Sequence, residues 1–296
     1  MQTKKTLRSQ IRPFFSLWYK RIRRSPVGTT GMIMFLAVLI VAVFAPWIAT
    51  HDPMKIDITN RFTPPVFQDG GTWANILGTD QLGRDIWSQL AYGSRLSLQI
   101  GVLSVGFSFM IGVSLGLVAG WYGGIIDTIL MRIVDVLQSI PSIVVLMALI
   151  AVLGPSVQTI IIVFSLTWWR TYSRIVRGET MQAKTIDYVQ AARAVGVNDL
   201  RIMFKHIMPN VIQSSLALAT VSVATVVMAE SALSFLGLGP QDAVTWGRMV
   251  AYGREYVATS WWMAVLPGLA IAFTVLGIVF LGDWVRDILD PKLRGT

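Results

Sequence analysis

The stretch YVQAARAVGVNDLRIMFKHIMPNV, residues 188–211, decides how this chain is interpreted, because it looks soluble although apolar segments flank it. Its helix-forming first part ends at Gly196, a residue that often terminates helices in the left-handed conformation. Asn198 then offers an N-cap, with Asp199 in the first turn of a second helix. We therefore expect two short helices joined at Gly196, with Pro209 ending the second.

The two expected helices differ in their surfaces. The first presents Ala191 and Ala192, a small-residue surface on which another protein could pack closely, and Arg193 adds charge beside it. The second has apolar residues at helical spacing, which predicts an amphipathic stripe. This stripe consists of Leu200, Met203, Phe204, Ile207 and Met208.

Composition places this hairpin in a membrane protein. The 296 residues are 54% hydrophobic and 14% charged, and the mean hydropathy is +0.60. Soluble domains carry about 25% charged residues, so the composition favours lipid as the solvent. The chain has no cysteine, which excludes a disulfide framework and any cysteine-based zinc or iron–sulfur site.

Six apolar segments are long enough to span a bilayer, which requires about 20 apolar residues. The third of them contains Pro141, which we expect to kink it. The sequence thus predicts an all-α integral membrane protein with a core of five helices after the first span, within residues 96–282. The six segments are 29–50, 96–120, 125–153, 157–176, 211–234 and 261–282.

The distribution of Lys and Arg predicts the orientation. With a cytoplasmic N-terminus, the outside loops 51–95 and 235–260 hold six of the 25 Lys and Arg residues. The basic residues then lie mostly on the inside, as the positive-inside rule requires, and both termini are cytoplasmic. This asymmetry explains the net charge of +9 without nucleic acid. We expect residues 1–28 to form a basic interfacial segment, and residues 283–296 a cytoplasmic tail.

The second span contains GVSLGLVAG, with Gly112, Gly116 and Gly120 four residues apart. Small residues at this spacing share one helix face and allow close helix packing. The same letters match the serine hydrolase pattern G-x-S-x-G around Ser114, but that motif needs a strand–turn–helix context and a histidine partner. The two histidines, His51 and His206, lie on opposite sides of the predicted membrane.

The sequence also lacks the motifs of several other chemistries. It contains no G-x-x-x-x-G-K-[ST] phosphate-binding loop and no H-E-x-x-H metal motif. Two distant histidines predict no metal site and no catalytic residue set. We therefore expect a protein that moves something across the membrane with an energy source outside the chain.

Two interpretations of the hairpin stay open on periodicity alone. It could pack only on its own bundle, or it could dock another protein. The cytoplasmic loop 177–210 is longer than a simple connection needs, and its Ala–Ala surface would be underpacked unless something covered it. Both features favour docking.

At these residues the chain resembles the permease subunits of ATP-binding-cassette (ABC) importers. Their cytoplasmic loop has the form E-A-A, three residues, G, and then a hydrophobic stretch that ends in Pro. Here Gln190-Ala191-Ala192, Gly196 and His206-Ile207-Met208-Pro209 match it, with Gln190 where the family often has Glu. The resemblance implies that Gln190, Ala191, Ala192, Arg193, Gly196, Leu200, His206 and Pro209 contact an ATPase subunit.

Further stretches resemble the dipeptide, oligopeptide and nickel branch of that family, and its C-type permease in particular. LGTDQLGRDIWSQLAYGSRLSL, residues 77–98, is one, although Gln89 replaces an Arg that is frequent there. AESALSFLGLG (229–239), TWG (245–247), WW with a later PG (261–268) and LGDWVRDILDPKL (281–293) are others. Together they cover nearly the whole chain in order.

The resemblance implies the type I importer fold in a bacterial cytoplasmic membrane and transport by alternating access. It implies a homologous B-type permease as heterodimer partner, two cytoplasmic ATPase subunits that hold ATP and Mg, and an extracytoplasmic binding protein. It implies no cofactor in this chain. Dipeptides, longer peptides, glutathione, nickel chelates and antimicrobial peptides all remain possible substrates.

Several charged residues keep open roles. Glu230, within the fifth span, could bind a substrate amine, pair with a partner's cation, or hold the structure or a gate. Arg84 and Asp85 could cap a helix or touch the binding protein. Asp127, Arg132 and Asp135 predict an interfacial ion network, with Arg132 and Asp135 spaced to pair.

Two other function classes remain as alternatives. A secondary transporter or channel would work without ATPase partners, but it would need an internal repeat and broken helices around a central ion site. A scaffold or receptor without transport is the other alternative. Co-purification with two ATPase chains would separate these from an ABC importer.

Overall fold

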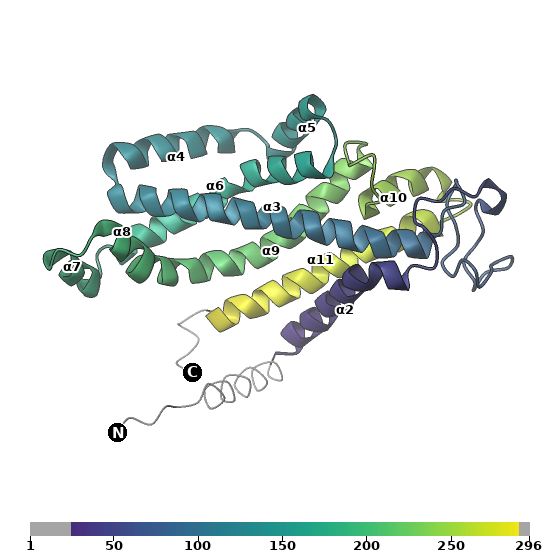
Figure 1. The fold of residues 1–296 in the computed structure, drawn as a ribbon, viewed down its shortest axis with the longest axis horizontal. Helices are drawn as coiled ribbons and strands as arrows, with labels where there is room; N and C mark the ends of the chain where they lie inside the picture. Colours follow the sequence, from purple (N-terminus) through teal and green to yellow (C-terminus); the bar gives the residue numbers. More distant parts are fainter. Residues whose placement is uncertain (1–24, 290–296) are drawn as a thin grey trace, which may run out of the picture.

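A computed structural model describes residues 25–289, and within that range every regular element is helical. The long helices lie side by side along the longest axis of the molecule (Figure 1). The predicted basic interfacial segment falls almost entirely outside the described residues, as do residues 290–296 of the predicted tail.

The helices follow the expected order, with boundaries that differ from the apolar segments. A short helix, α10, lies between the last two long ones. The α-helices are α2 (Pro26–Ile48), α3 (Ile86–Tyr122), α4 (Gly124–Ser139), α5 (Ser142–Leu153), α6 (Val157–Ala183), α7 (Asp187–Ala194), α8 (Asp199–Ile202), α9 (Met208–Phe235), α10 (Trp246–Gly253) and α11 (Trp262–Leu289). Single 3-10 turns occupy Ile58–Asn60 and Arg254–Tyr256, and a π-helical turn occupies Met203–Ile207.

Helix α3 begins ten residues before the predicted second span. Asp85 is its N-cap, and the Asp85 carboxylate accepts a hydrogen bond from the Ser88 backbone N–H at 2.8 Å. The helix ends at Gly123, whose φ of +65° lies in the left-handed region. The predicted span begins later because Ser88, Gln89, Ser94 and Arg95 lower the hydropathy of these first turns.

The predicted third span is two helices rather than one kinked helix. Helices α4 and α5 meet at Ile140 and Pro141 and differ in direction by 87°. Arg170 of α6 is buried against this break: its guanidinium donates to the carbonyl of Leu137 and, at 3.0 Å, to the hydroxyl of Ser142. Pro141 has no N–H to donate to the Leu137 carbonyl four residues earlier, and the Arg170 guanidinium supplies that donor instead.

The ion network on α4 has other partners than the sequence predicted. Asp135 pairs with Arg174 at 2.5 Å, and both side chains are half exposed. Asp127 pairs with Arg177 through two nitrogens of its guanidinium. The predicted pairing of Arg132 with Asp135 is therefore wrong, because the arginines of α6 reach these carboxylates across the helix interface.

The three glycines of α3 face α6. A Cβ atom on Gly112 would lie 2.5 Å from the Trp169 carbonyl oxygen, and one on Gly116 would lie 2.5 Å from the Ser173 carbonyl oxygen. At Gly120 it would lie 2.7 Å from Cβ of Thr180. The two backbones approach more closely than any larger residue would allow.

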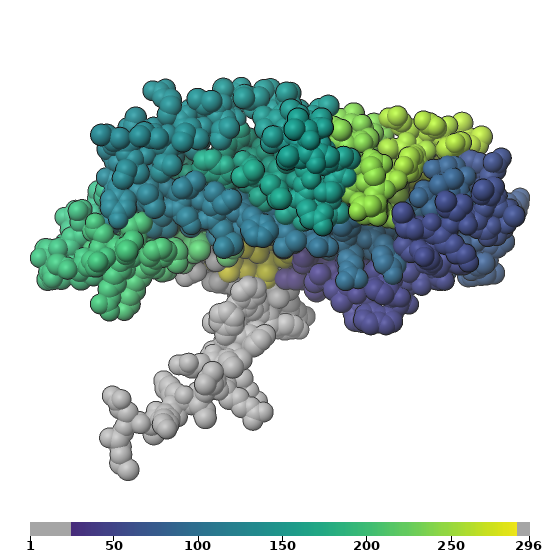
Figure 2. Space-filling view, turned by 45° about the horizontal axis from the view of Figure 1, so that its top comes forward, coloured from purple at the N-terminus to yellow at the C-terminus, as the bar shows by residue number. Residues whose placement is uncertain are grey.

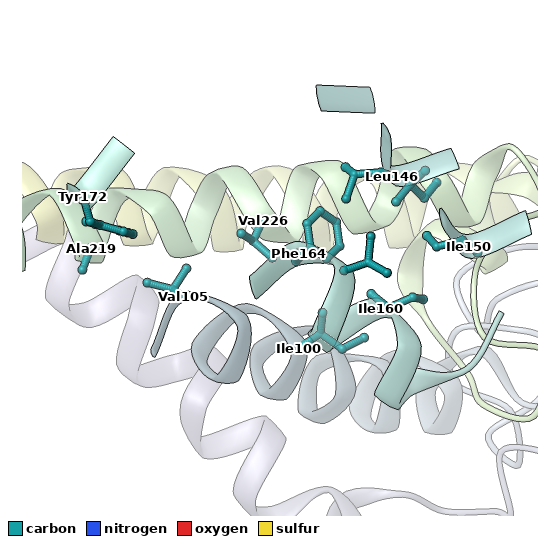
Figure 3. Packing of buried hydrophobic residues seen from close by; sticks show 11 residues of the cluster. Ile100, Val105, Leu146, Ile150, Ile160, Phe164, Tyr172, Ala219 and Val226 are labelled. Atoms are coloured by element: carbon teal, nitrogen blue, oxygen red, sulfur yellow. The ribbon is translucent and has the colours of Figure 1, made fainter. Parts of the chain in front are cut away.

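The central core lies between these helices. Side chains from α3, α5, α6 and α9 meet there, among them Ile100, Leu146, Phe164 and Val226 (Figure 3). Phe109 of α3 also packs edge-on against Tyr172 of α6, with ring centroids 5.5 Å apart. This packing fixes the scaffold from which the two ends of the bundle project.

Within residues 25–289, four helices are long and apolar enough to cross a membrane: α2, α3, the run Asp199–Phe235 and α11. The bent pair α4–α5 would make a fifth span. Helix α6 has 27 residues, but it carries Arg170, Arg174 and Arg177 toward its end. The six-span count and the N-in orientation thus stay predictions.

Candidate functional site

The segment from the end of α6 into the first turn of α9, residues 184–210, forms one end of the molecule. It contains α7 and α8, whereas the start of α3, the preceding residues 49–85 and α10 lie at the opposite end (Figure 1). The space-filling view shows this segment, in green, as a projection beyond the rest of the bundle (Figure 2). We call it the coupling segment.

Helix α7 ends in a Schellman motif centred on Gly196. The Val197 N–H donates to the Ala192 carbonyl at 3.1 Å, and the Gly196 N–H donates to the Arg193 carbonyl at 3.0 Å. Gly196 has a φ of +79°, which residues with a side chain rarely adopt. Asn198 then caps α8 by accepting from the Leu200 N–H at 2.9 Å, as the sequence predicted.

The prediction that Pro209 ends the second helix is wrong. Helix α8 continues through the π-helical turn into α9, so that residues 199–235 form one run. In the π-helical turn the Met208 N–H donates to the carbonyl of Met203, five residues back. Pro209 has no N–H to donate, and it takes a position in the first turn of α9, where helices tolerate proline.

The inner face of the coupling segment belongs to the bundle. Val189, Ile202, Met203 and Ile207 are buried. They join a hydrophobic cluster with Leu117 and Trp121 of α3 and with Val176 and Ala183 of α6. The segment is therefore packed against α3, α6 and the start of α9.

Two cations fix the segment to the end of α3. The Lys184 ammonium donates to the carbonyl of Trp121 and lies 5.6 Å from the centroid of its ring. The guanidinium carbon of Arg193 lies 5.2 Å from the same centroid. At these distances both cations are attracted by the indole face. Arg193, predicted as a contact with another protein, thus also holds its own chain.

The predicted amphipathic stripe divides between two faces. Met203 and Ile207 are buried, whereas Leu200 is 56% exposed and Phe204 is 58% exposed. The π-helical turn rotates the register, so a stripe drawn with the α-helical period does not stay on one side. Val195, beside Gly196, is 80% exposed. Leu200, Phe204 and Val195 give the outer side of the segment three large apolar residues.

The other predicted residues of this site lie as follows. Gln190 and Ala191 are exposed, Ala192 is half-buried, and Pro209 is exposed. The Gln190 amide donates to the carbonyl of Thr185, in the turn that precedes α7, at 3.2 Å. The His206 carbonyl, not its ring, accepts from the Asn210 amide at 2.9 Å.

Sequence reasoning missed the contact that closes the hairpin. The Tyr188 hydroxyl accepts a hydrogen bond from the Asn210 amide at 3.0 Å and lies 3.4 Å from the His206 carbonyl oxygen. Tyr188 and Asn210 are 22 residues apart, on either side of the turn at Gly196. No spacing rule relates them, because the pairing arises only when α7 folds back on the start of α9.

The chemistry of this outer face favours contact with a protein over catalysis. Exposed apolar side chains lie beside a backbone turn at Gly196, around which a Cβ would meet no atom within 4 Å. Such a projection can enter a groove, because protein interfaces have apolar centres with polar rims. Within residues 25–289, no group of three or more His, Asp and Glu side chains is placed to hold a metal ion.

Glu230 lies deep in the bundle, away from the coupling segment. Its side chain is fully buried, and one carboxylate oxygen accepts from the Ser234 hydroxyl at 2.6 Å. Ser234 in turn accepts from the Thr245 hydroxyl at 3.1 Å. Since Thr245 is the N-cap of α10, this chain of hydrogen bonds joins α9 to α10. The other oxygen of Glu230 has no hydrogen-bond partner among the described residues.

Arg84 and Asp85 are buried in their own chain. Arg84 donates to Asp80 at 2.6 Å, and Gln89 donates to the same carboxylate oxygen at 3.0 Å. Asp85 caps α3 and also accepts from Asn75 at 3.0 Å. Of the two roles that the sequence left open, the capping role is therefore the one that Asp85 performs here. A contact with a binding protein stays a prediction.

Two family models match the chain. Residues 112–295 match the model described as "Binding-protein-dependent transport system inner membrane component". Residues 14–65 match that of the "N-terminal TM domain of oligopeptide transport permease C". The first match contains the whole coupling segment.

Curated relatives match over nearly their whole length. A putative peptide transport system permease protein of Brucella suis is 38% identical over 276 residues, which cover 93% of this chain and 91% of the relative. The di/tripeptide transport system permease protein DppC of Pseudomonas aeruginosa is 39% identical, over 90% and 88% of the two chains. The dipeptide transport system permease protein DppC of Bacillus subtilis is 36% identical, over 93% and 85%.

A solved structure shares the fold. It is an inward-facing conformation of the MetNI methionine ABC transporter, one chain of which superposes with a TM-score of 0.56 at 21% identity. The match covers 69% of this chain and 97% of that chain. At this identity the likeness bears on the fold alone.

Proposed function

Because this chain belongs to the family of binding-protein-dependent transport system inner membrane components, we propose that it forms half of the pathway of an ATP-driven peptide importer. The relatives named as peptide, di/tripeptide and dipeptide permeases support a peptide substrate. The chain is a multi-pass protein of a bacterial inner membrane and works with separate ATPase subunits. It has no phosphate-binding loop of its own.

In this proposal the coupling segment transmits the ATPase cycle to the membrane. The single observation that carries it is the division of the segment into two faces. Its inner face is buried against α3, α6 and α9, and its outer face exposes Val195, Leu200 and Phe204. A groove on an ATPase subunit would cover the outer face. Movement of that subunit would then tilt three core helices together.

The remaining subunits follow from the same proposal. A homologous B-type permease supplies the second half of the pathway, and an extracytoplasmic binding protein delivers the peptide. ATP and Mg bind to two cytoplasmic ATPase subunits. ATP binding favours one arrangement of the two permeases and hydrolysis restores the other, so transport requires the coupling segment to contact the ATPase differently in the two states.

The test places a charge on the outer face without disturbing the inner one. Leu200→Asp puts a carboxylate at the centre of the proposed contact, where burial without a partner is costly. We expect peptide-stimulated ATPase activity of the reconstituted complex to fall at least about tenfold. Membrane insertion should not change, because Leu200 is 56% exposed and does not belong to the buried cluster of the inner face.

The matched control is Ile58→Asp, which changes an exposed apolar residue (66%, against 56% for Leu200) at the other end of the molecule. It should leave the stimulated ATPase activity intact. A second variant, Gly196→Pro, removes the left-handed turn, because proline holds φ near −65°. Unchanged ATPase activity in both Leu200→Asp and Gly196→Pro would contradict the docking role. Transport by the purified chain alone would favour a secondary transporter instead.

A further inference from the structure

A cavity lined by charged, polar and apolar residues lies at the end of the molecule opposite the coupling segment. Its volume is about 740 Å³, within the range of sites that hold small ligands. One wall is a single face of α3, formed by Tyr92, Arg95, Leu96 and Gln99. The other walls are residues 49–54, which follow α2, and residues 242–244, which precede α10. We call it the outer cavity.

Charges of both signs line the outer cavity on different walls. Arg95 is exposed on the α3 wall, while Asp52 and Asp242 lie on the two loop walls. None of the three has an ion-pair partner within residues 25–289. By contrast, Arg84 nearby is paired with Asp80, and Arg248 donates to three backbone carbonyls.

The arrangement on α3 suits a carboxylate. Arg95 presents a planar guanidinium that can donate two parallel hydrogen bonds. Gln99 lies one turn further along the same face, and its amide can donate a third. The loop walls suit an ammonium group, because the carboxylates of Asp52 and Asp242 are acceptors. Among the described residues, the Asp52 carboxylate accepts from one donor, the Met54 N–H, at 2.9 Å.

We propose that the outer cavity receives a peptide through its two free termini, with the carboxylate at Arg95 and Gln99 and the ammonium at Asp52 and Asp242. This assignment rests on the proposed function and adds a recognition step to it. A zwitterion with separated charges satisfies both kinds of wall at once. An uncharged solute would gain no charge-assisted hydrogen bond from either kind of wall.

The test measures peptide binding to the permease directly, so that capture by a binding protein does not enter. The complex is purified in detergent through a tag on this chain. Saturation-transfer NMR then compares alanyl-alanine with its C-terminal amide and with its N-acetyl derivative, each at millimolar concentration. The wild-type complex should bind the free peptide about tenfold more tightly than either derivative.

Two variants assign the termini to the walls. Arg95→Gln should weaken binding of the free peptide to the level of its amide, and Arg95→Lys should retain part of the preference. Asp242→Asn should reduce the preference over the N-acetyl derivative only. The matched control is Arg61→Gln, an exposed arginine that precedes α3 but does not line the outer cavity. It should behave as wild type.

Two results would overturn the proposal: no wild-type signal for alanyl-alanine, or an unchanged preference for the free carboxylate in Arg95→Gln. Arg95→Gln could instead leave peptide binding unchanged and raise the concentration of loaded binding protein that gives half-maximal ATPase activity. In that case Arg95 contacts the binding protein, and the proposal is wrong. If the wild-type complex still shows peptide-stimulated ATPase activity in these cases, the proposed function stands and only the role of the outer cavity is wrong. If that activity is absent, the proposed function itself fails.

Discussion

At the scale of single residues, the glycines of α3 show how closely sequence spacing and packing agree. Gly112, Gly116 and Gly120 were identified from spacing alone, and each lies where a Cβ would meet α6. Gly106, on the same helix, has no atom within 4 Å of that position. One helix thus offers a glycine that packing requires and a glycine that it does not.

This contrast gives a prediction with an internal control. Gly112→Ala should lower the stability of the protein by about 1–3 kcal/mol, because the added methyl group would force the backbones of α3 and α6 apart. Gly106→Ala should be neutral or stabilise by up to about 1 kcal/mol, since alanine favours a helix. Thermal melting of the detergent-solubilised protein measures both. Equal melting temperatures for the two variants would contradict the packing argument.

Charged residues were harder to place from sequence than glycines. Arg132 and Asp135 have the spacing of an ion pair within a helix, yet Asp135 pairs with Arg174 and Asp127 with Arg177. Spacing describes neighbours on one helix only. Which residue of another helix comes within reach depends on how α4 lies against α6, and no local pattern encodes that.

At the scale of elements, the break between α4 and α5 shows the same limit. Pro141 predicts that the helix is disturbed, but not that it turns by 87°. Arg170 comes from α6 and donates to a group on each side of the break, the Leu137 carbonyl at the end of α4 and the Ser142 hydroxyl at the start of α5. A proline marks the place of a break, and the partner that replaces the lost backbone hydrogen bonds sets its geometry.

We predict that the bend depends on this arginine. Arg170→Ala should leave the carbonyl of Leu137 and the hydroxyl of Ser142 without their donor, at a cost of about 1–3 kcal/mol, and should broaden the distribution of angles between α4 and α5. Distances between spin labels on the two helices, measured by pulsed electron paramagnetic resonance, would report this change.

Arg174→Ala is the matched control for Arg170→Ala. It removes an ion pair whose two side chains are half exposed, and such pairs contribute about 0–1 kcal/mol. The distances between the labels should therefore stay those of the wild type. If both variants broaden the distribution equally, the buried contacts of Arg170 do not hold the bend.

At the scale of the whole molecule, the two ends of the bundle have separate tasks in the proposed mechanism. The coupling segment at one end carries an apolar projection, and the outer cavity at the other end carries unpaired charges. Long helices, α3 and α9 above all, connect them. A tilt of these helices would change both ends together, as alternating access requires.

The predicted orientation can be tested because the chain has no cysteine. Single cysteines at Val195 and Trp73, both strongly exposed, lie at opposite ends of the molecule. With six spans and cytoplasmic termini, a membrane-impermeant maleimide added to intact spheroplasts should label Trp73→Cys and spare Val195→Cys. Inside-out vesicles should give the reverse. Labelling of both residues from the same side would exclude this topology.

The sequence by itself determined the helical class, the order of the long helices, the glycine face of α3 and the turn at Gly196. All of these depend on local composition, periodicity or backbone conformation, which neighbouring residues specify. The tertiary structure alone decided the bend at Pro141 and the ion-pair partners of Asp127 and Asp135. It also decided that Leu200 and Phe204 are exposed whereas Met203 and Ile207 are buried. Finally, it placed Arg95, Asp52 and Asp242 around one cavity. These features arise between segments far apart in the chain, and their geometry follows from helix packing rather than from any local pattern.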